Sequence, residues 1–455
     1  MLRTSLSRAI SAPKLRAPQL PIRRKMSSYH VSPFTTAVVS SMRRLYPEAL
    51  ADKSFDNTGL LLEAPFLPSR PRNRNSVLLT IDLTRAVAEE AIENNHSVVV
   101  AYHPIIFRPL KYITTGDSQQ LSMTLLLAHG ISVYCPHTAV DTVPDGMADW
   151  LCDIVTGKLE DPEPEAYAAA SPPSETEVTT SESGSEAPSK TSTRPTSPSA
   201  AEHDNDAMTD PFTTPKAKMR LARPSHVHRT YSKPSLPLPT DDFHANVISH
   251  TRSVITPSPR AAIDAANQFT GSENYNTSNT GAGRLIEFST PQPLTLLITR
   301  IAHAIGLPKG FAVAIPQGKN LGEINVSSVA TCPGSGGGVV RGTHADLIFT
   351  GELSHHEALA VTERGGCVIT LFHSNSERGY LWGIMKDRLE REVESEWAKV
   401  RSEESGKRGL SEELKQMLKD ESVGVVVSER DRDPYGIVVL DDTAVEGQKI
   451  DEGGT

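Results

Sequence analysis

Four side chains of types that bind transition metals follow apolar stretches of the sequence: His103, Asp141, His373 and Glu377. First-row metals such as Zn²⁺ or Fe²⁺ accept imidazole nitrogen and carboxylate oxygen as ligands. Two imidazoles and two carboxylates that converge on one point would therefore form a metal site, and a carboxylate can bridge two ions. We interpret these four residues as candidate metal ligands.

The elements that must position them are short strands. The run of β-branched residues at 98–101 predicts a strand buried on both faces, and Pro104 ends it just after His103. A second apolar stretch, 131–135, precedes Asp141, and a third, 367–372, precedes His373. Open α/β sheets bind ligands at the carboxyl ends of their strands, so these side chains are expected to meet there.

Other histidines lie near these positions. A histidine considered alone is more often a surface or core residue than a ligand. His137 lies four residues before Asp141 and could either orient the site or bind the metal. His355 and His356 follow Ser354, which begins a capping-box pattern, so they could pack on a helix or support the ligands through hydrogen bonds.

A glycine-rich loop at 334–338 could expose backbone N–H groups to a phosphate, although a plain tight turn explains it equally well. The loop lacks the Gly-Lys-Ser/Thr of a Walker motif and does not match G-x-G-x-x-G. Ser335 is not in a G-x-S-x-G elbow, which argues against a serine hydrolase.

The composition describes an acidic chain of 455 residues with a net charge of −9, which argues against a general nucleic-acid-binding surface. No apolar run approaches the ~20 residues that a membrane span needs. The four cysteines form no CxxC pair, so we interpret them as reduced, mostly buried thiols. The length allows two or three domains.

The coarse pattern predicts an α/β fold in two lobes, 29–158 and 284–445. In the first lobe, a strand at 77–81, a helix at 84–94 and the strand at 98–101 form a parallel β-α-β unit. Asp145 is placed to cap a helix over 146–155. Late apolar stretches, 423–427 and 437–440, are expected to be closing strands.

The segment between the lobes, 159–283, has a different composition. Ser, Thr, Pro and Glu dominate much of it, and such a chain buries too little apolar surface to offset its loss of entropy on ordering. We therefore expect a long disordered insert, and we expect deletion of residues 163–279 to leave folding and metal content intact.

Several motifs resemble the NIF-three-like family (NGG-interacting factor three), some bacterial members of which are named GTP cyclohydrolase type-2-like proteins. The resemblance covers about 31–157 and 283–440. Its motifs are FDNTGLLLE, TIDLT, AYHPIIF, HTAVD, CPGSGGG, TGELSHHEAL, HSNSERGYL and DRDPYG.

The resemblance implies a two-lobed fold with a dinuclear metal centre between the lobes, held by a His-His pair, an Asp, a His and a Glu. Carried over, these ligands are His103, Asp141, His373 and Glu377, whereas Tyr102 replaces the first histidine of the pair. We therefore expect one or two divalent ions per chain, zinc or iron. The family also implies a homo-oligomer, a toroidal hexamer.

Two functions are compatible with this resemblance. The chain could be a metal-dependent hydrolase of a phosphorylated or nucleotide-like substrate, with Glu377 or Asp141 positioning water. It could instead be a metal-stabilised interaction protein without turnover, a partner of transcriptional co-regulators that binds through the insert. Tyr102 favours the second function, and the retained ligands favour the first. Neither function involves a membrane or direct contact with nucleic acid.

The first 28 residues are basic, and no acidic residue occurs before Glu48. Leu2, Leu6 and Ile10 at helical spacing, beside arginines, are typical of a mitochondrial transit peptide. A disordered basic tail is the alternative. Translation from Met26 would remove most of this signal, and a cytoplasmic or nuclear location would then be expected.

We predict that residues 1–28 direct a fused fluorescent protein to mitochondria, because import receptors recognise a basic amphipathic helix. The double substitution Arg3→Glu, Arg8→Glu should abolish import. Microscopy of both fusions tests this. A wild-type fusion that stays diffuse in the cytosol would mean that the segment is only a basic tail.

Overall fold

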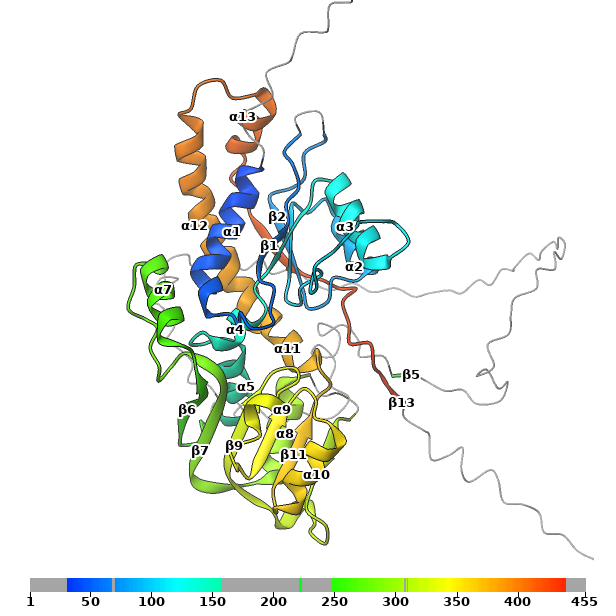
Figure 1. The fold of residues 1–455 in the computed structure, drawn as a ribbon, viewed down its shortest axis with the longest axis vertical. Helices are drawn as coiled ribbons and strands as arrows, with labels where there is room; N and C mark the ends of the chain where they lie inside the picture. Colours follow the sequence, from blue (N-terminus) through cyan, green and yellow to red (C-terminus); the bar gives the residue numbers. More distant parts are fainter. Residues whose placement is uncertain are drawn as a thin grey trace, which may run out of the picture.

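The computed structural model describes residues 31–67, 70–157, 221–222, 247–306, 308 and 310–438. These residues form two α/β lobes, each built around one sheet (Figure 1). Among the described helices, none has the length and apolar character needed to cross a membrane. The predicted α/β class and two-lobed architecture are confirmed.

The sheet of the first lobe has the strand order β1-β4-β3-β2-β12, with β1 antiparallel to β4 and the other neighbours parallel. Every residue of β2, β3 and β4 is buried, as their apolar sequences predict. The strands are β1 (Gly59–Leu62), β2 (Ser76–Thr80), β3 (Val98–Ala101), β4 (Ser132–Cys135) and β12 (Gly424–Val427).

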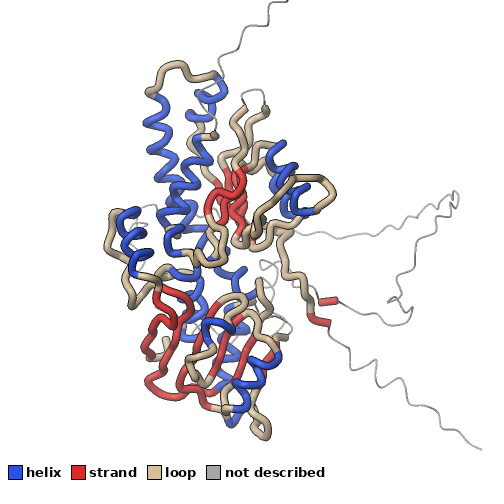
Figure 2. The backbone as a smooth tube through the Cα atoms, in the orientation of Figure 1, coloured by secondary structure: helices blue, strands red, loops and turns tan. Residues whose placement is uncertain are grey.

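Helices cover both faces of this sheet (Figures 1 and 2). Alternate residues of β3 point to opposite faces: Val98 packs in the core that contains α1 (Pro33–Leu45) and α12 (Lys386–Ser405). Val99 packs in the core that contains α2 (Arg85–Glu93) and α3 (Ser118–Ala128). The side chains of Thr84 and Asp117 cap α2 and α3.

Residues 386–427 return to the first lobe, so the prediction that the second lobe extends unbroken to 445 is wrong. Helices α12 and α13 (Glu412–Lys419) pack beside α1, and β12 pairs with β2. Sequence reasoning recognised an apolar strand here, but a strand pattern does not identify its neighbour. The other late strand, β13 (Ile437–Val438), pairs with β5 (Leu221–Ala222) instead of closing a lobe.

The second lobe contains a six-stranded sheet with the order β6-β7-β9-β10-β11-β8, in which β9, β10 and β11 are parallel. Helices α5 and α8 cover one face, and α9 and α10 cover the other. The strands are β6 (His250–Pro257), β7 (Gly281–Pro293), β8 (Ala312–Ala314), β9 (Asn325–Cys332), β10 (Leu347–Thr350) and β11 (Cys367–Thr370).

The remaining helices connect the two sheets or lie on the second. They are α4 (Thr138–Thr142), α5 (Met147–Thr156), α7 (Arg260–Thr270), α8 (Leu294–Ala304), α9 (Gly337–Val340), α10 (His355–Glu363) and α11 (Asn375–Tyr380), with short 3₁₀ turns at Glu48–Leu50 and Leu321–Glu323 and a π-helical turn at Leu381–Met385.

The prediction that the disordered insert extends to residue 283 is wrong. Strand β6 and helix α7 lie inside the predicted insert, and β6 forms the edge of the second sheet. Composition misled because β6 is half-exposed and mostly polar, and because α7 buries only Ile263 and Ala266. Arg252 of β6 also forms ion pairs with Asp149 and Asp153 of α5. Residues 158–220 and 223–246 lie outside the described part.

The prediction that Asp145 caps α5 is also wrong. Gly146 is the N-cap residue, and Asp145 adopts a left-handed conformation with φ 55°. Its backbone N–H donates to the carboxylate of Asp149, 3.1 Å away. That carboxylate also pairs with the buried side chain of Arg284 at the start of β7, so α5 is joined to the second sheet.

We predict that deleting residues 163–279 strongly lowers the thermal midpoint or the yield of soluble protein, because β7 loses its neighbour β6 and Asp149 loses Arg252. Deleting only 163–244 is the matched control, and it spares β6 and α7. Thermal unfolding of the two variants tests this. Equal stability would mean that β6 contributes little to the fold.

Candidate metal centre

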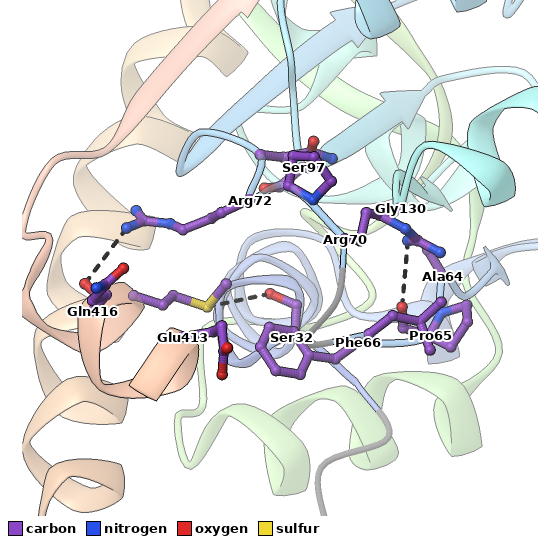
Figure 3. Close-up of a pocket in the computed structure, with 14 residues that line it drawn as sticks. Ser32, Ala64, Pro65, Phe66, Arg70, Arg72, Ser97, Gly130, Glu413 and Gln416 are labelled. Carbon is purple, nitrogen blue, oxygen red and sulfur yellow. Dashed lines mark hydrogen bonds between the residues drawn. The ribbon is translucent and has the colours of Figure 1, made fainter. Parts of the chain in front are cut away.

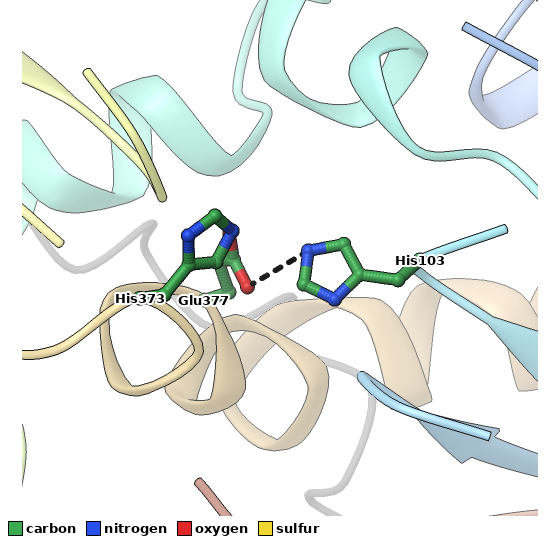
Figure 4. Close-up of side chains that lie close together, drawn as sticks. All are labelled: His103, His373 and Glu377. Carbon is green, nitrogen blue, oxygen red and sulfur yellow. Dashed lines mark ion pairs between the residues drawn. The ribbon is translucent and has the colours of Figure 1, made fainter. Parts of the chain in front are cut away.

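Three of the four predicted ligands converge between the lobes (Figure 4). One ligand atom from each of His103, His373 and Glu377 lies within 4.8 Å of the others. Nε2 of His103 is 3.6 Å from Oε2 of Glu377, and Nε2 of His373 is 3.4 Å from Oε1. Imidazole and carboxylate at this separation can hold a metal ion.

Strand ends place these side chains. The N–H of His103 donates to the carbonyl of Ile81, so His103 is fixed just beyond the end of β3. His373 follows β11, and Glu377 lies one turn later in the first turn of α11. The first lobe therefore supplies His103, and the segment after the second sheet supplies the other two.

The far nitrogen of each histidine faces a carboxylate. Nδ1 of His103 lies 2.9 Å from Asp82, and Nδ1 of His373 lies 2.8 Å from Glu352. Such bonds fix the orientation of an imidazole and leave Nε2 for a metal. The hydrogen bond with His373 is also the main cause that lowers the pKa of Glu352.

Sequence reasoning missed these two carboxylates, although a signal was present. Asp82 follows β2 and Glu352 follows β10, so both lie at the same strand edges as the histidines that they orient.

The fourth predicted ligand, Asp141, is not part of the three-residue cluster. Its Oδ1 accepts a hydrogen bond of 2.8 Å from the hydroxyl of Tyr102. Tyr102 is 2% exposed, and burial together with the charge of Asp141 raises its pKa well above the usual value. Tyr102 is therefore a neutral phenol that binds Asp141, which differs from the histidine that the family pattern has there.

His137 lies beside the cluster, with its ring centroid 5.4 Å from that of His103 and 5.3 Å from that of Tyr102. Its Nδ1 is 2.6 Å from the carboxylate of Asp56, the same arrangement as in the other two histidines. His137 also has φ 34°, an uncommon backbone conformation for a non-glycine residue. It is placed to orient the site or to bind an ion near Asp141.

The chemistry of the cluster fits a cation. Glu377 is 1% exposed, and its Oε2 has no hydrogen-bond partner. A buried carboxylate oxygen without a donor is costly, and a bound ion would satisfy it. Burial lowers the pKa of His103, but hydrogen bonds and charges of Asp82 and Glu377 outweigh burial and raise it to about 10. Burial is the main cause that raises the pKa of Asp141 to about 7.

The glycine loop packs directly on the cluster. A Cβ atom at Gly334 would lie 2.7 Å from Oε1 of Glu377 and 3.0 Å from Nε2 of His373. Gly334 also has φ 59°. Its N–H donates to the hydroxyl of Ser376, and the N–H of Gly336 donates to Thr350. Glycine is therefore required at position 334, because a side chain there would collide with Glu377 and His373. The N–H groups of Gly334 and Gly336 already donate hydrogen bonds within the protein.

The segment 431–433 connects the two parts of the chain that carry the cluster residues. Asp431 accepts from the N–H of Ile81, 2.7 Å away, and also forms an ion pair with Arg378. Asp433 accepts from the hydroxyl of Ser374 at 2.8 Å. This segment therefore joins the end of β2 to α11, and it explains the DRDPYG motif, whose role sequence reasoning did not identify.

His355 and His356 lie at the start of α10, outside the cluster. Ser354 and Glu357 form the predicted capping box. Both histidines are exposed, and their rings are 5.3 Å apart. His356 lines a cavity of about 390 Å³ together with Arg341 and other residues.

A further pocket of about 200 Å³ lies in the first lobe (Figure 3). Its wall includes Arg70, Arg72 and Phe66, with Glu413 and Gln416 of α13 opposite. Arg72 forms an ion pair with Asp420 at the end of α13. None of the cluster residues lines this pocket, so we place the chemistry at His103, His373 and Glu377.

Comparison with known proteins identifies the family of this chain. The family model Duf34/NIF3 (NGG1p interacting factor 3) matches residues 35–404. The chain belongs to the Duf34/NIF3 family. The Schizosaccharomyces pombe protein named Protein NIF3 homolog is 35% identical over 366 residues, which cover 80% of this chain and 91% of that protein.

More distant members of the Duf34/NIF3 family match along nearly the same length. The Saccharomyces cerevisiae protein named NGG1-interacting factor 3 is 28% identical and covers 78% of this chain and 90% of its own length. A solved structure of a Bacillus cereus protein related to NIF3 is 17% identical, with a TM-score of 0.48 and coverage of 88% of this chain and 98% of that chain.

We predict that Tyr102→His increases the metal bound per chain, because an imidazole beside Asp141 would complete the ligand pair that this family member lacks. Tyr102→Phe is the control, since it removes the hydroxyl without adding a ligand. Elemental analysis of protein purified without chelator gives the stoichiometry, with about one ion expected for the wild type. No increase in Tyr102→His would mean that Tyr102 does not limit metal binding.

Proposed function

We propose that the protein is a metal-dependent hydrolase of a phosphorylated or nucleotide-like substrate. The observation that supports this most is the buried carboxylate of Glu377, whose Oε2 lacks a hydrogen-bond partner. Nε2 of His103 lies 3.6 Å from this Oε2, and Nε2 of His373 lies 3.4 Å from Oε1. An orphaned carboxylate in such a ligand set is expected where a cation is bound.

His103, His373 and Glu377 would hold the ion, with zinc or iron matching the nitrogen and oxygen donors. A bound divalent ion would lower the pKa of water and polarise a phosphoryl oxygen. Asp82 and Glu352 keep the two imidazoles oriented toward the site.

Asp141 is the residue best suited to move a proton. Burial raises its pKa to about 7, toward the neutral range in which a general acid or base works. The Tyr102 hydroxyl fixes Oδ1 of Asp141, so the orientation of the carboxyl group is set. Glu377, in contrast, is a ligand and would position the ion rather than accept a proton.

A second candidate function is that of a metal-stabilised interaction protein. The yeast relative is named as an interacting factor, which supports a protein partner for this chain as well. The insert predicted at 159–283 would then bind the partner, and the protein would act without turnover. We also propose that the protein forms a homo-oligomer. We propose that it is located in mitochondria, with a cytoplasmic or nuclear location as the alternative, for example for a form that begins at Met26.

We expect His373→Ala to remove most of the bound metal and all hydrolysis of aryl phosphates, because the cluster loses one of its two imidazoles. His356→Ala, an exposed histidine outside the cluster, should retain both. Metal content is measured by elemental analysis and hydrolysis by phosphate release. Unchanged metal content in His373→Ala would reject the site. Intact metal binding without turnover on phosphate monoesters, diesters and cyclic esters would favour the interaction protein.

A further inference from the structure

Aromatic rings continue outward from the metal cluster on the side of the first lobe. The ring of Phe55 contacts that of His137 edge-on at 6.5 Å and that of Phe107 at 6.4 Å. Phe55 is 52% exposed and Phe107 is 48% exposed, whereas the His137 side chain is 14% exposed. The rings therefore lead from the buried cluster to the surface.

A second pair of rings adjoins the cluster on the opposite lobe. Phe372 directly precedes His373 and packs against Tyr435 with ring centroids 6.0 Å apart. Tyr435 is 66% exposed. Phe372 has φ 68°, which is a strained backbone conformation for a bulky residue. Such strain persists where the surrounding structure holds the residue in place.

The exposed rings are not explained by the fold. Exposed aromatic side chains that cluster at one place mark binding surfaces rather than ordinary surface residues. The loop after Phe107 adds further exposed apolar side chains: Leu110, Tyr112 and Ile113. Because Phe55 contacts His137, and the ring of His137 lies 5.4 Å from that of His103, a molecule stacked on Phe55 and Phe107 would be within reach of the cluster.

We propose that Phe55 and Phe107 bind the aromatic ring of a substrate whose phosphate reaches the cluster of His103, His373 and Glu377. The inference rests on the proposed metal-dependent function and specifies its substrate class: aromatic phosphate esters, nucleotides included. Planar rings stack on exposed aromatic side chains without needing hydrogen-bond partners, so the rim would select for a ring rather than for one particular base.

The experiment compares two phosphonates that differ only in the ring, phenylphosphonate and methylphosphonate. Both carry the oxygens that a metal site binds, and neither contains a hydrolysable ester. Binding to the full metal-loaded chain is measured by calorimetry. We expect phenylphosphonate to bind at least about fivefold more tightly to the wild type, the lower range for aromatic stacking.

The variants Phe55→Ala and Phe107→Ala should each reduce this preference for phenylphosphonate and leave methylphosphonate binding and metal content unchanged. Phe107→Trp keeps a ring and should retain the preference. Phe269→Ala, an equally exposed ring on α7, is the control and should behave as the wild type.

Three results would overturn the proposal. Equal affinity of the wild type for the two phosphonates would reject aromatic selection while leaving the metal-dependent function intact. No metal-dependent binding of either phosphonate would reject the proposed function together with this inference. A changed elution volume of Phe107→Ala in size-exclusion chromatography, with unchanged phosphonate affinities, would identify the rings as a contact between copies of the chain.

Discussion

The carboxylate of Glu377 is the group on which the arrangement of the two lobes depends. It is nearly inaccessible to water, and one imidazole from each side of the interlobe region approaches it: His103 after β3 and His373 after β11. A buried charge is tolerated only when opposite charge or donors compensate it. The two sheets must therefore be held in a fixed relation, since a small displacement of either would leave the carboxylate uncompensated.

The contacts that hold the lobes come from distant parts of the sequence. Asp431 links the end of β2 to Arg378, the residue after Glu377, and Asp433 accepts a hydrogen bond from Ser374 at the start of α11. The chain can form both contacts because its C-terminal part returns to the first sheet as β12. The return of β12 therefore affects the site, because it brings Asp431 into contact with Arg378, next to Glu377.

The strand ends and the three cluster residues could be predicted from the sequence, because apolar runs followed by His and Pro are local signals. The partner of Asp141 could not be predicted, because the hydrogen bond from Tyr102 depends on how two loops pack. Strand β6 was missed for a different reason. An edge strand with one exposed face has the polar composition of a disordered segment, and only its pairing with β7 distinguishes the two.

Carboxylates surround the three histidines His103, His137 and His373. Each faces a carboxylate at Nδ1, so Asp56, Asp82 and Glu352 surround a site that already contains Glu377, with Asp141 close by. These carboxylates would repel one another unless protons or a cation compensated them. Burial raises the pKa of Asp141, and the neighbouring carboxylates of Asp82 and Glu377 raise the pKa of His103, so both groups hold a proton more tightly than usual. A divalent ion bound by the Nε2 atoms of the histidines would also supply positive charge at this place. Protons and the metal ion are therefore expected to compete for the site.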